Sequence, residues 1–401
     1  MNHDNRTAIE PSLSISATGV TLEHDGLVLR FDAAGRLTTI YDGNHVYHRG
    51  VENTMLEKWW TDAYVDETSV RIRRFRRVSA SRRKQLLETA YDRASRCLRP
   101  ILARREDEFS TAERESMRQV LRQSRKKLEK ERRAVRSIYT PIGVLPPDQY
   151  KSVVLQAVMG CPYDCSFCTL YDDTDVRVRS IEEFDRHTQA VKSFFNRGLQ
   201  SRRTVFLGDA DPLSAPQDVL IPLLKLVAQE FPLQYENGIY TFLTARTAAN
   251  MSRQKLNLLA EHGIERVYLG VESGCEDVLE VLRKPQTPDE VVTGVRQVKA
   301  AGIDVGVIVL AGAGGHELAT SHLARTSELL ETLPLDSHDI AYVSPLEEDA
   351  TADYREQLHE HSLSRMSERE IAAQAKRLRT HLAEKIPARA SRYHVSEFIY
   401  F

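Results

Sequence analysis

The sequence predicts an α/β fold in which a parallel sheet is preceded by a small antiparallel β-meander and a basic helical region. Between residues 150 and 343, six short apolar runs alternate with longer amphipathic runs. This order is typical of β/α units, whose parallel strands are buried on both faces by helices. We expect four regions: the meander at 1–70, the helical region at 71–137, the β/α core at 138–346 and a C-terminal extension at 347–401.

Composition narrows the function classes. The 401 residues carry 55 Lys and Arg against 57 Asp and Glu, a net charge of -2, so the chain is not a uniformly basic nucleic-acid binder. Three of its five cysteines are clustered, which argues against a disulfide scaffold and favours a reducing cytoplasm. The first 16 residues are polar and lack a signal-peptide pattern. No apolar run approaches the roughly 18 residues that span a bilayer, so we expect no membrane partner.

The N-terminal region has the pattern of a β-meander. Residues 1 to about 15 are polar and are expected to be disordered. From Gly19 to Tyr47, apolar and polar side chains alternate, and Asp25-Gly26, Ala34-Gly35 and Asp42-Gly43 punctuate the alternation. This pattern predicts three or four antiparallel strands joined by tight turns.

A strongly basic block follows. Residues 71–136 carry 23 Lys and Arg against 9 Asp and Glu, and five apolar residues recur at helical spacing: Met117, Val120, Leu121, Leu128 and Val135. One interpretation is a solvated helical hairpin. Another is a surface for phosphate-bearing partners such as tRNA or a nucleotide-linked substrate. The block could also dock against the more acidic remainder of the chain.

The core elements follow a proline-punctuated linker. Strands are expected at residues 150–158, 204–209, 239–244, 266–272, 304–310 and 338–343. Helices are expected at 180–197, after Pro216, and at 252–262, 287–302, 317–333 and 367–385, with capping boxes at Ser180–Glu183 and Thr287–Glu290. The tail ends in Tyr393, Phe398, Tyr400 and Phe401, which we expect to fold back onto the core.

Three cysteines follow the first core strand as C-x₃-C-x₂-C: Cys161, Cys165 and Cys168. Three neighbouring thiols cannot all pair as disulfides, but they can bind one iron–sulfur cluster. Four cysteines normally hold a [4Fe–4S] cluster, so three leave one iron open to a ligand. The alternative is a zinc knuckle, which would need a fourth ligand; the nearest candidate, His187, lies 19 residues beyond the last cysteine.

The triplet resembles the hallmark of the radical S-adenosylmethionine (SAM) superfamily, C-x₃-C-x-aromatic-C, with Phe167 in the aromatic position. The resemblance implies a partial (β/α)₆ barrel, a [4Fe–4S] cluster on the three cysteines, and SAM bound to the open iron. It also implies reductive cleavage of SAM to methionine and a 5′-deoxyadenosyl radical. The reducing electron would come from an external flavodoxin- or ferredoxin-like donor.

Sites on parallel β/α sheets form at the carboxyl ends of the strands. After the second strand, Gly208 and Asp209 stand where the family's Gly-Gly-Glu motif receives the SAM ammonium, although Asp209 could instead cap a helix. After the fourth strand, the resemblance assigns Glu272 or Ser273 to the ribose hydroxyls. Twelve residues beyond that acid, Lys284 stands in the position of a basic residue that binds the SAM carboxylate.

Arg246, which ends the third strand, is another candidate for the SAM carboxylate or for substrate. Val309 and Leu310 fall where the family forms an apolar adenine slot, and Ser344 is a further adenine-side candidate. The remaining thiols, Cys97 and Cys275, are too few for a second cluster. Cys275 is either a buried thiol or a participant near the active face.

The Gly-Val-Glu-Ser segment at residues 270–273 is similar to the branch of coproporphyrinogen-dehydrogenase-like and methylthiotransferase-like enzymes. We therefore expect a biosynthetic radical SAM enzyme acting on a small molecule. One alternative is an RNA-modifying enzyme that uses the basic block. Another is a non-catalytic iron–sulfur or SAM-binding protein. No second corrinoid-type domain is evident, so cobalamin is not expected.

Overall fold

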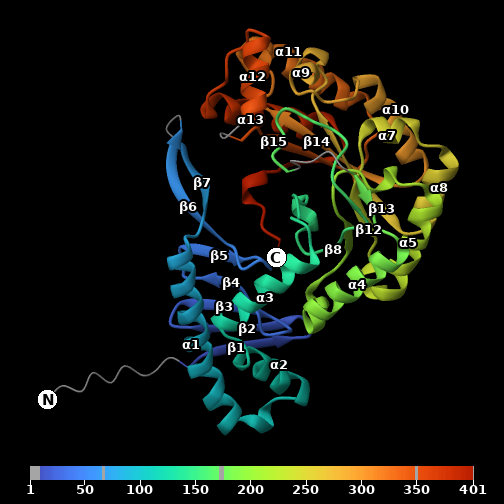
Figure 1. Ribbon diagram of the computed structural model, residues 1–401. Helices are drawn as coiled ribbons and strands as arrows, with labels where there is room; N and C mark the ends of the chain where they lie inside the picture. Colours follow the sequence, from blue (N-terminus) through green and yellow to red (C-terminus); the bar gives the residue numbers. More distant parts are fainter. Residues whose placement is uncertain (1–9, 66–67, 171–175, 348–350, 401) are drawn as a thin grey trace. The chain divides into compact units, whose positions relative to one another are not determined.

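The computed structural model describes residues 10–65, 68–170, 176–347 and 351–400 (Figure 1). The chain forms two units. Unit 1 comprises residues 1–140, 190–202 and 399–401, and unit 2 comprises residues 141–189 and 203–398. None of the helices in the described ranges is long and apolar enough to cross a membrane.

Unit 1 contains a seven-stranded antiparallel sheet in which each strand pairs with the next along the chain. The strands are β1 (Ser12–Ser16), β2 (Gly19–His24), β3 (Leu27–Asp32), β4 (Leu37–Tyr41), β5 (His45–Arg49), β6 (Met55–Val65) and β7 (Thr68–Arg77). The meander is therefore longer than the three or four strands predicted.

Two segments differ from the sequence prediction. Residues 12–16 were expected to be disordered, but they form β1, whose backbone pairs with β2 from Ser12–Glu23 to Ser16–Gly19. Residues 71–77 were assigned to the helical region, but they lie in β7 and pair with β6. The boundary predicted at residue 70 thus falls inside a strand, which is defined by its backbone pairing with β6.

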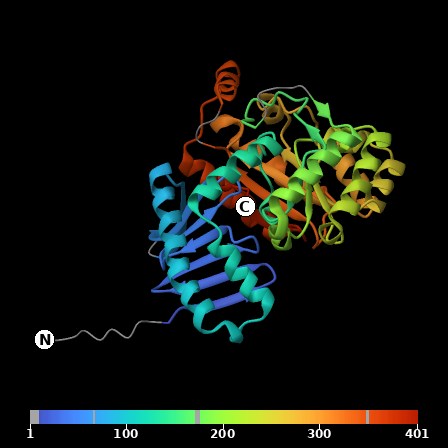
Figure 2. The same cartoon turned by 60° about the horizontal axis from the view of Figure 1, so that its bottom comes forward.

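Three helices cover one face of this sheet: α1 (Ala80–Arg104), α2 (Thr111–Leu121) and α3 (Arg125–Ile138) (Figure 2). Alternate strand residues such as Leu22, Leu29 and Phe31 join helix residues such as Leu87 and Val120 in one buried core. The predicted helical pattern is correct but is divided, because Ser124 caps a new helix by accepting a hydrogen bond from the Lys127 amide.

Residues far along the chain complete unit 1. The Val51 amide donates to the Tyr400 carbonyl over 2.7 Å. The Tyr400 ring lies edge-on to the rings of Tyr139 and Phe195, and the Arg202 guanidinium stacks over both Phe195 and Tyr400. Tyr400 therefore contributes to packing, as cation–π and edge-to-face contacts do in other cores, and Phe401 lies outside the described residues.

Unit 2 is organised around a seven-stranded parallel sheet of order β16-β15-β14-β13-β12-β11-β8. Its strands are β8 (Val153–Leu155), β11 (Val205–Leu207), β12 (Ile239–Phe242), β13 (Ile264–Glu272), β14 (Asp304–Ala311), β15 (Ile340–Pro345) and β16 (Arg389–Arg392). A short antiparallel pair, β9 (Val158–Met159) and β10 (Arg177–Val178), flanks the cysteine loop. The α/β class and the six predicted strands are confirmed, and the C-terminal extension adds β16 as a seventh.

Helices follow the strands along the outer side of the parallel sheet (Figure 1). They are α4 (Ile181–Phe195), α5 (Gln217–Glu230), α6 (Pro232–Tyr235), α7 (Ala245–Asn250), α8 (Arg253–Glu261), α9 (Glu276–Val281), α10 (Pro288–Ala300), α11 (Gly315–Thr332), α12 (Ala352–Glu360) and α13 (Glu368–Lys385). Both predicted capping boxes are present, at Ser180–Glu183 and Thr287–Glu290.

The amino-terminal end of the parallel sheet is closed by polar contacts. The hydroxyls of Tyr268 and Tyr342 both donate to Asp148, and Arg266 forms an ion pair with the same carboxylate. All of these groups are at most slightly exposed, so each finds its partner inside the protein, as buried polar groups require.

Candidate active site

The carboxyl end of the parallel sheet holds a cavity of about 200 Å³. Cys161, Cys165 and Cys168 all line it, and none of the three forms a disulfide. Phe167 of the same loop also lines the cavity, together with predicted residues from four other places in the sequence: Glu272, Lys284, Leu310 and Ser344. The structure therefore brings eight of the thirteen predicted site residues together.

The cysteine loop is held by hydrogen bonds from its own backbone and from Ser166. The Ser166 amide donates to the Leu282 carbonyl and its hydroxyl donates to the Val281 carbonyl, at 3.0 and 2.8 Å. The Cys168 amide donates to the Cys165 carbonyl over 3.0 Å. These bonds place the three thiols before any ligand arrives.

The thiols are half-buried, and burial favours the neutral form of Cys161 and Cys165. It raises the pKa of the Cys165 thiol to about 11 and also raises the pKa of Cys161. A bound metal reverses this preference, because a coordinating thiol loses its proton. The loop is thus suited to hold a cationic iron–sulfur group and poorly suited to hold free thiolates.

Lys284 and Glu272 form a buried ion pair beside the cysteines, with the Lys284 ammonium 3.1 Å from Glu272 Oε1. Burial acts to lower the pKa of Lys284, but Glu272 together with the neighbouring Cys165 and Cys161 outweighs it, and the pKa is raised. Lys284 is therefore charged at neutral pH. A Cβ at Gly270 would lie 2.3 Å from Glu272 Oε1 and 2.9 Å from Lys284 Nζ, so only glycine leaves room for the pair.

Backbone geometry directs Glu272 into the cavity. A β-bulge interrupts the pairing of β13 with β14 between Gly270 and Glu272, and Glu272 has a positive φ of 59°. A positive φ in a residue with a side chain is costly and occurs where the surrounding structure enforces it, often at functional sites. Gln286 contributes by donating to the carbonyls of Gly270 and Val271.

Ser273 points away from the cavity. It is fully buried, its hydroxyl lies 2.8 Å from His322 Nδ1, and it accepts a hydrogen bond from the Cys275 amide. His322 Nε2 lies 2.8 Å from the Leu310 carbonyl, so the ring links the ends of β13 and β14. Burial lowers the pKa of His322 to about 4, and the imidazole is neutral at pH 7. No local sequence pattern predicts this link.

Asp209 and Gly208 lie behind the cysteine loop and do not line the cavity. Asp209 has a positive φ of 72°, and its carboxylate accepts from the Gly160 amide over 3.3 Å and from Gln156 Nε2 over 3.4 Å. Burial raises the pKa of Asp209 to about 6. Its observed contacts support the loop that carries Cys161.

Val309 and Arg246 also lie off the cavity. Val309 is fully buried between Ile308 and Leu310, which both line the cavity, because successive side chains of a strand point to opposite faces. Arg246 lies on α7, half exposed, 3.2 Å from Glu290.

Ser344 supplies an unsatisfied polar group to the cavity wall. It is 2% exposed, and its hydroxyl finds no hydrogen-bond partner within the described part of the chain. A buried hydroxyl without a partner is uncommon and points to a ligand that completes it. The cavity therefore offers three thiols, an ammonium, a carboxylate and one unpaired hydroxyl among apolar walls, a donor set that fits an iron–sulfur group with a zwitterionic ligand.

Residues 156–325 match the model of the Radical SAM superfamily. This region of the chain is therefore similar to the Radical SAM superfamily. The matched range contains the three cysteines, Glu272 and Lys284, and the cofactors of this superfamily are a [4Fe–4S] cluster and SAM.

Several known proteins are similar to this chain. The heme chaperone HemW of Bacillus subtilis is 21% identical over 197 residues, which are 48% of this chain and 50% of HemW. The uncharacterized methyltransferase PH0819 of Pyrococcus horikoshii is 27% identical over 168 residues, which are 40% of this chain and 34% of PH0819. The chain therefore spans half or less of the length of these curated relatives.

Among solved structures, coproporphyrinogen III oxidase (HemN) from Escherichia coli aligns with a TM-score of 0.45 and 14% identity, over 63% of this chain and 55% of HemN.

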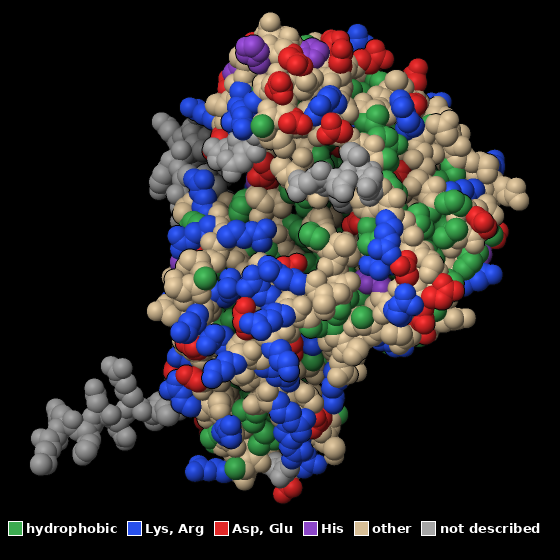
Figure 3. Space-filling model, viewed as in Figure 1, with side chains coloured by type: hydrophobic (Ala, Val, Ile, Leu, Met, Phe, Trp, Pro, Cys, Tyr) green, Lys and Arg blue, Asp and Glu red, His purple; other side chains and the backbone are tan. Residues whose placement is uncertain are grey.

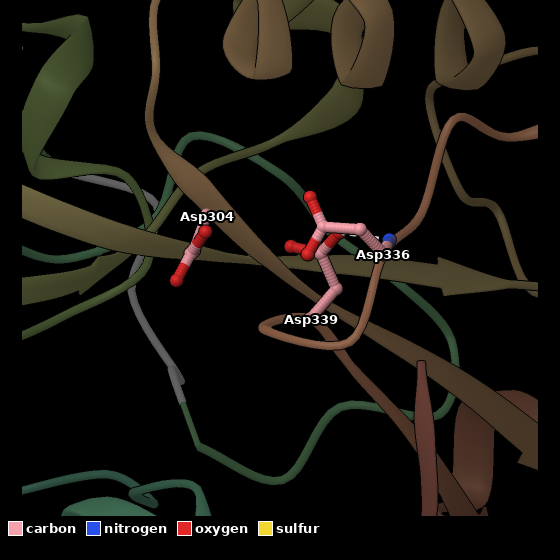
Figure 4. A group of neighbouring side chains, drawn as sticks. All are labelled: Asp304, Asp336 and Asp339. Carbon is pink, nitrogen blue, oxygen red and sulfur yellow. Dashed lines mark hydrogen bonds between the residues drawn. The ribbon is translucent and has the colours of Figure 1, made fainter. Parts of the chain in front are cut away.

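A second group of acidic side chains lies at the opposite end of the parallel sheet (Figure 4). The carboxylates of Asp304, Asp336 and Asp339 lie within 4.8 Å of one another. The Lys299 ammonium contacts all three, at 3.6, 2.8 and 2.9 Å respectively, and Arg266 also pairs with Asp304 at 3.3 Å. This cluster is a structural ion-pair network with an internal cation in place of a metal.

Proposed function

We propose that Cys161, Cys165 and Cys168 bind the [4Fe–4S] cluster and that SAM and a small-molecule substrate occupy the cavity beside them. The observation that carries the proposal is the meeting of three unpaired thiols with the Lys284–Glu272 ion pair on one cavity wall. When bound, the cluster supplies the electron that cleaves SAM to methionine and a 5′-deoxyadenosyl radical. An external flavodoxin- or ferredoxin-like protein in a reducing cytoplasm would provide that electron.

The side chains that line the cavity suggest how SAM is held. Lys284 presents its ammonium to the SAM carboxylate, and Glu272 accepts hydrogen bonds from the ribose hydroxyls. Leu310 packs against the adenine, while Ser344 offers it an unpaired hydroxyl. Arg246, Ser273 and Val309 are weaker candidates for these contacts, because their side chains do not line the cavity.

Two features support a small substrate. The cavity is lined by apolar side chains beyond the SAM contacts, among them Phe242, Ile308 and Val395. Its depth is limited, because Tyr268 lines the cavity and its hydroxyl is tied to Asp148. A compact molecule with an apolar portion fits such a space better than a polymer segment. Closure by apolar side chains would also keep water from the radical.

The test is anaerobic reconstitution with iron and sulfide, reduction with dithionite in the presence of SAM, and chromatography of the products. We expect 5′-deoxyadenosine from the wild-type chain and its loss, with loss of bound iron, in Cys165→Ala. Cys97→Ala is the matched control, because Cys97 lies in α1 of unit 1 and should leave both readouts unchanged.

The alternatives give different results. A non-catalytic SAM-binding protein would take up the cluster and bind SAM but yield no 5′-deoxyadenosine, even with reductant and extracts of small metabolites. Full iron loading of Cys165→Ala would contradict the assigned ligand set.

A further inference from the structure

The sheet of unit 1 has a second face, which α1–α3 do not cover. Strand alternation turns residues such as Leu22, Leu29 and Ile40 toward the helices, so their neighbours lie on the other side, here called the open sheet face. Cross-strand pairing arranges that face in two rows: Glu23, Val28, Tyr41, Val46, Lys58 and Phe75, then Thr21, Arg30, Thr39, His48, Leu56 and Arg77. Leu56 is fully buried, so the face is covered at that position, whereas Arg30, Tyr41 and Trp60 are exposed. A further pair, Trp60 and Arg73, lies one step beyond Lys58 and Phe75.

Aromatic rings are exposed on this face. Tyr41 is 39% exposed and Trp60 is 40% exposed, and they are the only large aromatic side chains classed as exposed among the described residues. Both lie on the open sheet face, on strands β4 and β6. Exposed aromatic rings on a sheet lose contact with water when a flat partner stacks on them, so they favour a ligand with planar groups.

Positive charge accompanies the rings. Arg30, Arg73 and Arg77 are exposed and Lys58 is half-buried, whereas the two rows contain one carboxylate, Glu23. Neighbouring strands lie about 4.8 Å apart, so each exposed ring has a cation within one or two strands. Rings that can stack on bases and cations that can meet phosphates are the combination used by sheet surfaces that bind single-stranded nucleic acid.

The helical face of unit 1 is more basic but lacks this combination. Lys and Arg side chains gather over α1–α3 (Figure 3). No exposed large aromatic side chain lies on these helices in the described chain. Positive charge alone would favour the helical face as the binding site, whereas positive charge together with exposed aromatic rings favours the sheet face.

We propose that the open sheet face binds single-stranded nucleic acid, with Tyr41 and Trp60 stacking on bases and Arg30, Lys58, Arg73 and Arg77 meeting the phosphates. Bases paired inside a duplex present no free faces to these rings, so the site selects unpaired strands. This binding is independent of the reaction proposed for unit 2.

Fluorescence anisotropy with the full chain and labelled 12-nucleotide strands tests the proposal. We expect single strands to bind more tightly than a duplex of the same sequence, and affinity to fall as salt rises. Tyr41→Ala and Trp60→Ala should each weaken binding about 5- to 100-fold, the range for loss of one stacked base. They should not change the slope of log affinity against log salt.

Charge variants separate the two faces. Arg30→Gln and Arg77→Gln should each reduce the salt slope by about 0.7, the value for one phosphate contact on a single strand. The matched control is Lys126→Gln with Lys130→Gln on α3, two exposed lysines of the helical face, which should leave the slope unchanged. RNA and DNA strands are compared directly: equal affinity supports base and phosphate contacts alone, and preference for RNA supports added contacts from Thr21 and Thr39 to the 2′-hydroxyl.

Three results would overturn the proposal. Duplex binding equal to single-strand binding would remove the stacking argument. Loss of affinity in the α3 variant but not in Tyr41→Ala would move the site to the helices. Concentration-dependent dimers that disappear in Tyr41→Ala, without any oligonucleotide binding, would assign the face to a second copy of the chain. Cys165→Ala should still bind oligonucleotide and Tyr41→Ala should still form 5′-deoxyadenosine, so failure of either proposal is visible separately.

Discussion

The two ends of the parallel sheet in unit 2 both bury a lysine beside carboxylates, but they differ in what those charges face. At the amino-terminal end, Lys299 contacts three aspartates, and Asp339 also accepts from the Val305 amide over 2.8 Å. At the carboxyl end, Lys284 contacts Glu272 alone and lines a cavity. Charges matched within the protein stabilise the fold, whereas charges that face a cavity are available to a ligand.

The largest expected effect is on stability and concerns the amino-terminal end of the parallel sheet. Lys299→Met leaves the fully buried Asp339 without its cation, so the free energy of unfolding should fall by about 3–5 kcal/mol. SAM affinity of the folded protein should not change. Urea unfolding followed by circular dichroism measures the first quantity, and calorimetric titration of the reconstituted protein measures the second. The exposed Lys385→Met is the control, and a loss of SAM affinity in Lys299→Met would show that the two ends are coupled.

The next effect concerns the buried His322, which supports the cavity end. Its pKa is lowered from 6.5 to about 4 by burial, so between these values the unfolded chain binds a proton that the folded chain does not. Its contribution to stability is present above pH 6.5 and is lost as pH falls toward 4, by about 3 kcal/mol in total and about 2 kcal/mol between pH 7 and pH 5.

The glutamine in His322→Gln cannot bind a proton, so the free energy of unfolding of this variant should change less between pH 7 and pH 5. The control variant at the exposed His359, His359→Gln, should show the same pH dependence as the wild-type chain. Chemical unfolding at pH 7, 6 and 5 gives the comparison. An unchanged slope in His322→Gln would mean that the imidazole is charged in the folded protein.

The smallest expected effect distinguishes two candidates for the SAM carboxylate. Lys284→Met should weaken SAM binding about 10- to 100-fold, because one hydrogen bond to a charged group contributes about 1.5–3 kcal/mol. Arg246→Met removes a cation that already pairs with Glu290 and should leave SAM affinity unchanged. The reverse result would assign the carboxylate to Arg246.

Much of unit 2 could be predicted from the sequence because its signals are local. Buried strands of a parallel sheet are short apolar runs, and capping residues such as Ser180 and Thr287 mark helix starts directly. The cysteine spacing was sufficient to predict the candidate site, because three thiols in one loop can be recognised without knowledge of long-range contacts. Strand periodicity also separates Leu310 from Val309, a distinction that the sequence prediction did not use.

The rest depended on contacts between distant residues. Strand β7 is rich in arginine, so its sequence alone resembles part of a basic helix. Only its pairing with β6 identifies it as a strand. Strand β16, Arg-Ala-Ser-Arg, has no apolar run and forms by adding to the edge of β15. The link from Ser273 through His322 to Leu310 joins three elements and cannot be seen in any one segment.

The contact between Val51 and Tyr400 has a consequence for how the protein is made. Unit 1 contains the first strands of the chain, yet its aromatic cluster includes a residue nearly 350 positions later. During synthesis on the ribosome, the aromatic cluster of unit 1 therefore stays incomplete and exposed until residue 400 has left the exit tunnel. During synthesis this surface is a natural client for chaperones, and tags or truncations that displace residues 399–400 should loosen the amino-terminal half of the molecule.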